Sequence, residues 1–292
     1  MFRSGAVAAG LTRAGSGGAR RARVGLLLAA VLWSLAGVFI KFLPLHPLAI
    51  VFYRSFFASL FFGFFARTTS FPRAATAVSM CSYTAAISAF VAANKLTTAA
   101  NAIVLQYTAP IFVFLIVRFL LREAVSAASW LALLCGMLGV SLIFAGSAGE
   151  PDAPGVAMAV LSGALFAIYM VSQRFLTGVH AATLTFANNL ACCVLLLPFV
   201  WRELAVAGDQ AAILAVMGVV QLGIPYWLFA RAVASITVQE ASLIVLVEPV
   251  LNPVWVALAV GELPSAATAG GAALILGGLA LRYWREKPPP GR

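Results

Sequence analysis

Charged residues are scarce in this 292-residue chain: Asp, Glu, Lys and Arg make up 10%, against 63% hydrophobic residues. A soluble domain has about 25% charged residues, and its core could not hide this much apolar surface from water. The mean hydropathy of +1.01 therefore excludes a soluble globular domain and indicates a chain whose solvent is lipid. A net charge of +10 would favour nucleic acid in a soluble protein. Here the basic residues lie at the ends of apolar runs, so we expect no nucleic-acid partner.

Residues for catalysis or metal binding are also few. The two histidines, His46 and His180, lie at the ends of apolar runs, and the two aspartates, Asp152 and Asp209, lie in connectors. The runs therefore lack Ser-His, paired-Asp and His-rich metal arrangements, and the four cysteines lack metal-ligand spacing. The sequence contains no G-x-x-x-x-G-K-[ST] motif for a nucleotide. We predict no enzyme, no metal site and no cofactor.

Long apolar runs follow one another along the chain. Each has about 18–22 residues, the length that crosses a hydrocarbon core of about 30 Å. The fold class predicted is therefore an all-α integral membrane protein with ten transmembrane helices. We expect them at residues 24–43, 47–66, 75–93, 99–120, 126–145, 155–175, 182–201, 211–231, 240–260 and 266–283.

The second half of the chain repeats the first. An offset of 139 residues superimposes Pro110 on Pro249 and Glu123 on Glu262. Duplicated membrane units are typical of secondary transporters, whose substrate lies between the repeats. Five spans in each repeat is an odd number, so we predict two inverted five-helix repeats. The first covers residues 24–145 and the second covers residues 155–283.

The basic residues predict the orientation. Fifteen lie on the side of the chain ends and three on the other side, and Arg54 lies within a span. Under the positive-inside rule both termini are cytoplasmic, in a multi-pass protein of the cell's inner (plasma) membrane. Residues 1–23 contain five arginines and no acid and predict a disordered cytoplasmic tail; a transit peptide is the alternative. Residues 284–292 would form a second cytoplasmic tail.

Several motifs together resemble a known family. The second half contains Glu248-Pro249, Gly261-Glu262 and glycine pairs at 270–271 and 277–278. This pattern resembles the second repeat of the EamA-type drug/metabolite transporters, and Arg54 in the second span is similar to the pattern of their first repeat. The resemblance covers about residues 24–283. It implies a ten-helix secondary transporter for the efflux of small metabolites such as amino acids or their analogues, by alternating access at a midplane cavity. A non-transporting membrane chaperone or sensor and, less favoured, an intramembrane enzyme are the alternatives.

Polar and aromatic side chains inside the spans are candidates for the substrate cavity. Glu248 should lie near the bilayer centre, where a carboxylate is costly unless it faces a partner or a cavity. Its role as a substrate contact, a proton carrier or an architectural group stays open. Arg54 could bind a carboxylate or pair with Glu248. The candidates are Trp33, Tyr53, Arg54, Tyr83, Asn101, Gln106, Tyr107, Tyr169, Gln173, Tyr226, Trp227, Glu248 and Asn252.

Prolines, glycines and acids at matching positions predict structural roles. Prolines within spans should kink them and free backbone carbonyls, at Pro110, Pro225, Pro249 and Pro253. Glu123 and Glu262 each precede a helix start, where a carboxylate can meet free N–H groups. The glycine-rich fifth and tenth spans permit close helix approach. We expect them to serve packing or a homodimer, and not the path of the small-molecule metabolite.

Overall fold

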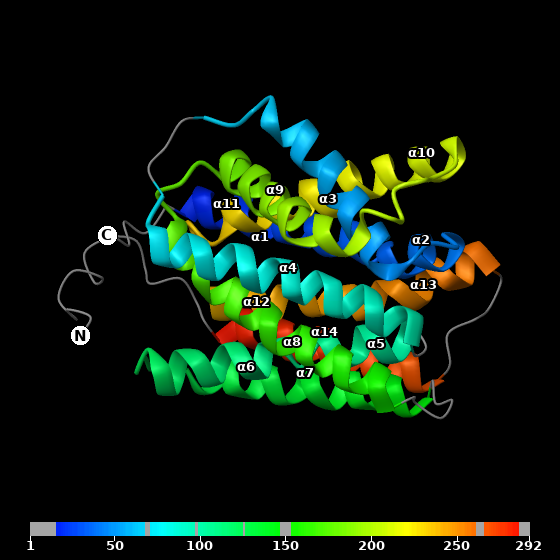
Figure 1. Ribbon diagram of the computed structural model, residues 1–292. Helices are drawn as coiled ribbons and strands as arrows, with labels where there is room; N and C mark the ends of the chain where they lie inside the picture. The colour runs from blue at the N-terminus through cyan, green and yellow to red at the C-terminus, as the bar shows by residue number, and fades with distance from the viewer. Residues whose placement is uncertain are drawn as a thin grey trace.

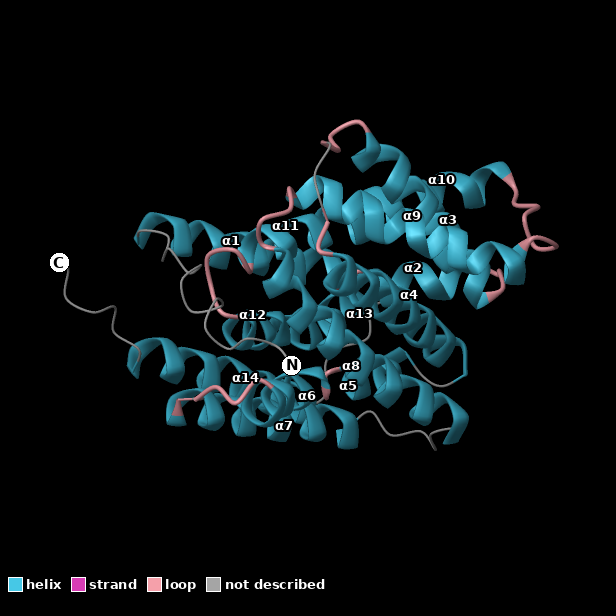
Figure 2. Cartoon of the chain, turned by 60° about the vertical axis from the view of Figure 1, so that its left-hand side comes forward, coloured by secondary structure: helices cyan, strands magenta, loops and turns pink. Residues whose placement is uncertain are grey.

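The structure is a computed structural model that describes residues 16–67, 71–96, 99–124, 126–146, 153–260 and 266–285. Helices form all the regular structure of these residues and make up ten spans, which confirms the predicted fold class (Figure 1). Short loops join the helix ends (Figure 2). By length and composition, five helical stretches are long and apolar enough to cross a membrane: Gly17–Ile40, Arg73–Leu96, Pro154–Leu176, Ala181–Val200 and Gly208–Ala232.

Six spans are essentially single helices, and four are interrupted. The single helices are α3 (Pro47–Gly63), α4 (Arg73–Leu96), α7 (Ala127–Gly146), α8 (Ala153–Gln173, continued by a 3-10 turn, Arg174–Leu176), α9 (Ala181–Val200) and α14 (Ala266–Arg285). The interrupted spans are α1 (Ser16–Trp33) with α2 (Ala36–Phe42); α5 (Ala99–Gln106) with α6 (Ala109–Leu115) and a π-helix, Ile116–Leu120; α10 (Gly208–Val216), a π-helix, Met217–Gly223, and α11 (Ile224–Ala232); and α12 (Val238–Ile244), a 3-10 turn, Val245–Val247, and α13 (Glu248–Val260).

The first span begins earlier than its composition suggests. α1 starts at Ser16, so the prediction that residues 16–23 belong to a disordered tail was wrong. The physical reason is a partner that composition cannot reveal: Arg23 Nε donates to Glu240 Oε1 of α12 at 2.7 Å, and a charge-assisted bond stabilises this basic turn. At the other end α14 extends to Arg285. Residues 1–15 and 286–292, with the alternative of a transit peptide, lie outside the described residues.

The helix starts reproduce the offset of the repeat. α12, α13 and α14 each begin 139 residues after α5, α6 and α7 (238 − 99, 248 − 109, 266 − 127). The interruptions of spans 4 and 9 fall at corresponding places, directly before Pro110 and Pro249. Span 8 is likewise irregular just before Pro225. The fourth predicted kink is not a break, because α13 continues through Pro253.

The fifth and tenth spans, α7 and α14, pack against each other along one side of the bundle (Figure 1). The contact is very close: a Cβ added to Gly278 would lie 2.6 Å from the Cβ of Cys135. Only a residue without a side chain permits this approach. Packing within the chain therefore accounts for Gly278, and a homodimer through the same spans stays a prediction.

Candidate functional site

Aromatic rings from both repeats meet at the centre of the bundle. Tyr226 on α11 lies 4.8 Å from Tyr83 on α4, 5.0 Å from Trp33 on α1 and 5.5 Å from Tyr169 on α8, between ring centroids. All three pairs are edge-to-face, an arrangement that aromatic rings prefer, and all four side chains are buried. The structure thus brings four predicted cavity residues together. They form a packed cluster, hereafter the aromatic cluster, where the sequence suggested an open cavity.

Arg54 on α3 lies beside the aromatic cluster with only 3% of its surface exposed. Its electrostatic neighbours are Tyr83, Tyr226 and Cys192. Among the described residues, its Nε and Nη1 have no hydrogen-bond partner, and no ion pair joins it to Glu248. The pairing considered as an alternative is therefore not formed. Because a buried, unpaired charge is costly, this position suits the anionic group of a ligand.

A glycine explains why the backbone of α3 lies so close to span 8 at this point. A Cβ on Gly218, inside the π-helix, would lie 2.5 Å from the carbonyl oxygen of Arg54. The π-helix itself is a common feature of functional sites in helices. Span 8 thus contributes the surface against which Arg54 is held.

Glu248 is the first residue of α13 and is partly buried. The hydroxyl of Tyr107, at the matching interruption of span 4, lies near its carboxyl group without completing a hydrogen bond. Tyr226 is within electrostatic range of both Glu248 and Arg54. A carboxylate from the second repeat and a guanidinium from the first therefore both neighbour the aromatic cluster.

Hydrogen bonds join the interruption of span 1 to span 9. Asn252 Nδ2 donates to the carbonyl of Ser34 at 3.0 Å, and Trp255 Nε1 donates to Ser34 Oγ at 2.5 Å. Ser34 lies between α1 and α2, where the backbone loses its helical pattern. Asn252, predicted as a cavity residue, thus bonds a backbone carbonyl at the break.

A polar network ties α4 to α8 and α9 next to the aromatic cluster. Gln173 Nε2 donates to Ser79 Oγ at 2.9 Å, and the Ser79 hydroxyl donates to Asn188 Oδ1 at 3.1 Å. The Tyr83 hydroxyl donates to Asn189 Oδ1 at 2.8 Å. The bond to Asn189 holds Tyr83 in place, whereas Gln173 binds α4 four residues earlier, at Ser79.

Other predicted cavity residues lie elsewhere. Gln106, at the end of α5, donates through Nε2 to Ser162 Oγ at 2.8 Å. The Tyr53 hydroxyl donates to the carbonyl of Leu204 at 2.6 Å, in the loop between α9 and α10. Trp227 lines a separate groove beside α3 and α9. The side chain of Asn101, and all of Glu262, lie outside the part of the chain that the structure describes.

The sequence analysis missed further buried polar groups near the cluster. Ser55, Thr84 and Gln221 each have a buried side-chain oxygen without a hydrogen-bond partner among the described residues. Gln221 Nε2 donates to the carbonyl of Trp33 at 3.4 Å. A polar residue in an apolar run was the available sign, but the run does not show which face turns inward.

Two ion pairs join the repeats at the end of the bundle where the described chain begins and ends. Arg23 pairs with Glu240 at 2.7 Å, and Arg174 Nη2 lies 2.8 Å from Glu123 Oε1. Glu123 was expected at the start of the next helix. Instead, Ser126 accepts from the N–H of Ser129 there, and Glu123 reaches the second repeat.

Comparisons with known proteins agree with this architecture. The EamA-like transporter family matches over residues 21–145 and 153–284. An "Uncharacterized transporter" of Archaeoglobus fulgidus is 28% identical over 275 residues, which cover 91% of this chain and 97% of the relative. The "Uncharacterized transporter YdfC" of Bacillus subtilis is 28% identical over 200 residues, 65% of this chain and 64% of the relative.

A solved crystal structure of a protein shares the fold, with a TM-score of 0.77 and 20% identity over 91% of this chain and 98% of its own. The match of the family model to both halves of the chain decides the class. The chain belongs to the EamA-like transporter family, with two EamA domains, and is a multi-pass membrane protein. The predicted family is confirmed.

Proposed function

We propose that this transporter exports small metabolites with both a carboxylate and an amino group, such as amino acids or their analogues. The observation that supports this is the buried guanidinium of Arg54, whose Nε and Nη1 lack partners among the described residues. A planar guanidinium binds a carboxylate through two parallel bonds. Glu248 is available for the ammonium group, and the aromatic cluster can cover the rest of the solute.

Alternating access follows from the same arrangement. The aromatic rings are packed together, so they must part before a solute can bind. Movement of one repeat against the other would part them and would break the ion pairs Arg23–Glu240 and Arg174–Glu123. The interrupted spans 1, 4, 8 and 9 adjoin the cluster and could absorb this movement. The driving force is the gradient of the solute or of a coupling ion, with both termini in the cytoplasm.

Counterflow of labelled amino acids into proteoliposomes with the purified protein tests the proposal. Arg54→Gln should weaken the apparent affinity for carboxylate-bearing solutes about 10- to 100-fold, because a bond to a charged group contributes about 1.5–3 kcal/mol. Arg54→Lys keeps the charge but loses the paired geometry, so its loss should be smaller.

Arg118→Gln is the matched control, because Arg118 is an exposed arginine in the π-helix Ile116–Leu120, which follows α6. Normal affinity in a folded Arg54→Gln protein would contradict the proposed role. Absence of flux for every labelled metabolite in the folded wild-type protein would favour the membrane chaperone or sensor.

A further inference from the structure

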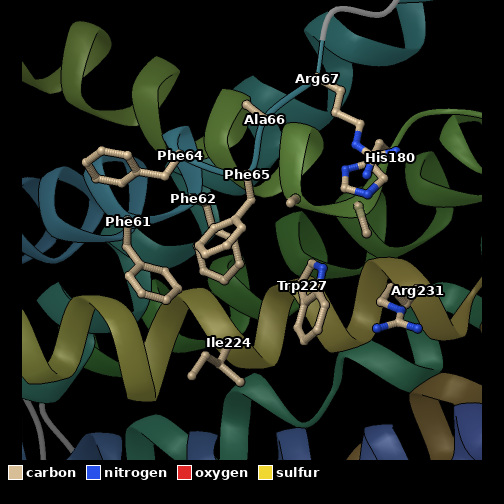
Figure 3. Close-up of a pocket in the computed structure, with 12 residues that line it drawn as sticks. Phe61, Phe62, Phe64, Phe65, Ala66, Arg67, His180, Ile224, Trp227 and Arg231 are labelled. Carbon is tan, nitrogen blue, oxygen red and sulfur yellow. The ribbon is translucent and has the colours of Figure 1, made fainter.

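A groove lies on the bundle surface, away from the aromatic cluster. It runs between the end of α3, the start of α9 and α11, and its volume is about 950 Å³ (Figure 3). This is within the range of about 300–1,000 Å³ that is usual for ligand sites. Its floor includes Phe61, Phe65, Ile224 and Trp227, and none of its 12 lining residues is acidic. The groove can therefore accept an apolar chain without repelling an anion.

Three basic side chains gather at one end of the groove: Arg67, His180 and Arg231 (Figure 3). Hydrogen bonds hold the backbone of Arg67 in position, and the guanidinium of Arg231 lies over an aromatic ring. The N–H of Arg67 donates to Thr183 Oγ1 at 2.8 Å, and the Thr183 hydroxyl donates back to the Arg67 carbonyl at 3.2 Å. The guanidinium of Arg231 lies 4.9 Å from the centroid of the Trp227 ring.

The start of α9 adds to the positive potential. His180 directly precedes this 20-residue helix, and no side chain of the described residues caps its first N–H groups through a hydrogen bond at that position. A helix N-terminus attracts anions through these groups and through the helix dipole. The helix thus reinforces the three basic side chains.

The depth of the groove indicates which anion would bind. α3 has 17 residues, about 26 Å at 1.5 Å per residue, which is less than a hydrocarbon core of about 30 Å. Arg67 follows four residues after its end, so the groove runs from apolar depth to the level of lipid headgroups. Basic pockets between transmembrane helices are known to suit anionic headgroups.

We propose that this groove binds one anionic phospholipid. Its phosphate lies among Arg67, His180 and Arg231, and an acyl chain lies along Phe61 and Trp227. A free anion would make no use of the aromatic floor, and a lipid without net charge would make no use of the two arginines. The groove is separate from the aromatic cluster, so this site stands whether or not amino acids are the substrate.

Native mass spectrometry of the purified full chain, titrated with phosphatidylglycerol or phosphatidylcholine, tests the proposal. We expect tighter binding of phosphatidylglycerol. Arg67→Gln and Arg231→Gln should each weaken it about fivefold, and the double variant about 25-fold, from the ~1 kcal/mol per basic residue near an anionic surface. The control double variant, Arg118→Gln/Arg285→Gln, removes two exposed charges from the same end of the bundle and should bind normally.

Two further arms separate a lipid from a free anion. Trp227→Ala should weaken binding of phosphatidylglycerol, whereas glycerol phosphate, the headgroup without chains, should not displace it. Equal affinity for the two lipids, an equal loss in both double variants, or displacement by glycerol phosphate would overturn the proposal. Circular dichroism shows whether each variant is folded. If the groove double variant is not folded, the affinities of the two single variants are compared with that of the wild-type protein.

Discussion

Two neighbouring glycines on α14 should respond in opposite ways to the addition of a methyl group. A Cβ on Gly278 would lie 2.6 Å from the Cβ of Cys135 and 3.4 Å from the carbonyl oxygen of Ala132, both on α7. A Cβ on Gly277 meets nothing within 4 Å. Since the Cβ of Cys135 is attached to the backbone, α7 and α14 must separate by roughly 1 Å to reach an ordinary carbon contact of about 3.5–4.0 Å.

The expected free energies follow from this geometry. Overpacking costs about 1–3 kcal/mol, whereas alanine in place of glycine in a helix gains up to about 1 kcal/mol. Gly278→Ala should therefore lower the free energy of unfolding, and Gly277→Ala should leave it unchanged or raise it. Lipid tails are as apolar as the helices, so burial elsewhere does not compensate for the lost helix contact.

Thermal unfolding of the two variants in one detergent is the assay. Both variants gain the same free energy from the higher helix propensity of alanine. The difference between their Tm values should therefore reflect only the overpacking cost in Gly278→Ala. At about 2–4 °C for each kcal/mol, this difference is roughly 2–12 °C, with Gly278→Ala the lower. Equal Tm values would refute the close α7–α14 contact.

Three further outcomes can be measured. Arg23→Glu and Glu240→Arg should each impair counterflow, and the combined exchange should restore it. With Arg23 43% and Glu240 9% exposed, the interaction free energy lost in each single variant should lie between the ~1 kcal/mol of a surface pair and the ~3–5 kcal/mol of a buried one. No recovery in the double variant would contradict the pairing. In a variant lacking the native cysteines, an impermeant thiol reagent should label Ala205→Cys in intact cells and Gly178→Cys only after lysis; the reverse pattern would disprove cytoplasmic termini. Glu248→Gln should weaken apparent affinity most for amino-bearing solutes, measured by counterflow, whereas selective loss of uphill transport in the folded protein would show that Glu248 carries a coupling proton.

The sequence by itself determined the spans, the repeat and the family. These follow from local composition and short patterns: an apolar run of sufficient length spans a bilayer in any fold, and proline removes an N–H wherever it stands. The interruptions before Pro110 and Pro249 were therefore predictable. Arg54 and Glu248 could also be selected, because a charge within an apolar run is conspicuous.

Only the tertiary structure decided which side chains meet. Tyr83 and Tyr226 converge while Tyr53 and Trp227 do not, because a helix that is apolar on all sides shows little in its sequence of which face turns inward. The bond that stabilises the start of α1 joins Arg23 to Glu240, 217 residues away. No local pattern in the sequence reveals such a partner. Gly277 and Gly278 are the same residue type in the same helix. Their difference arises from rotation about the helix axis, which places one against α7 and leaves the other free.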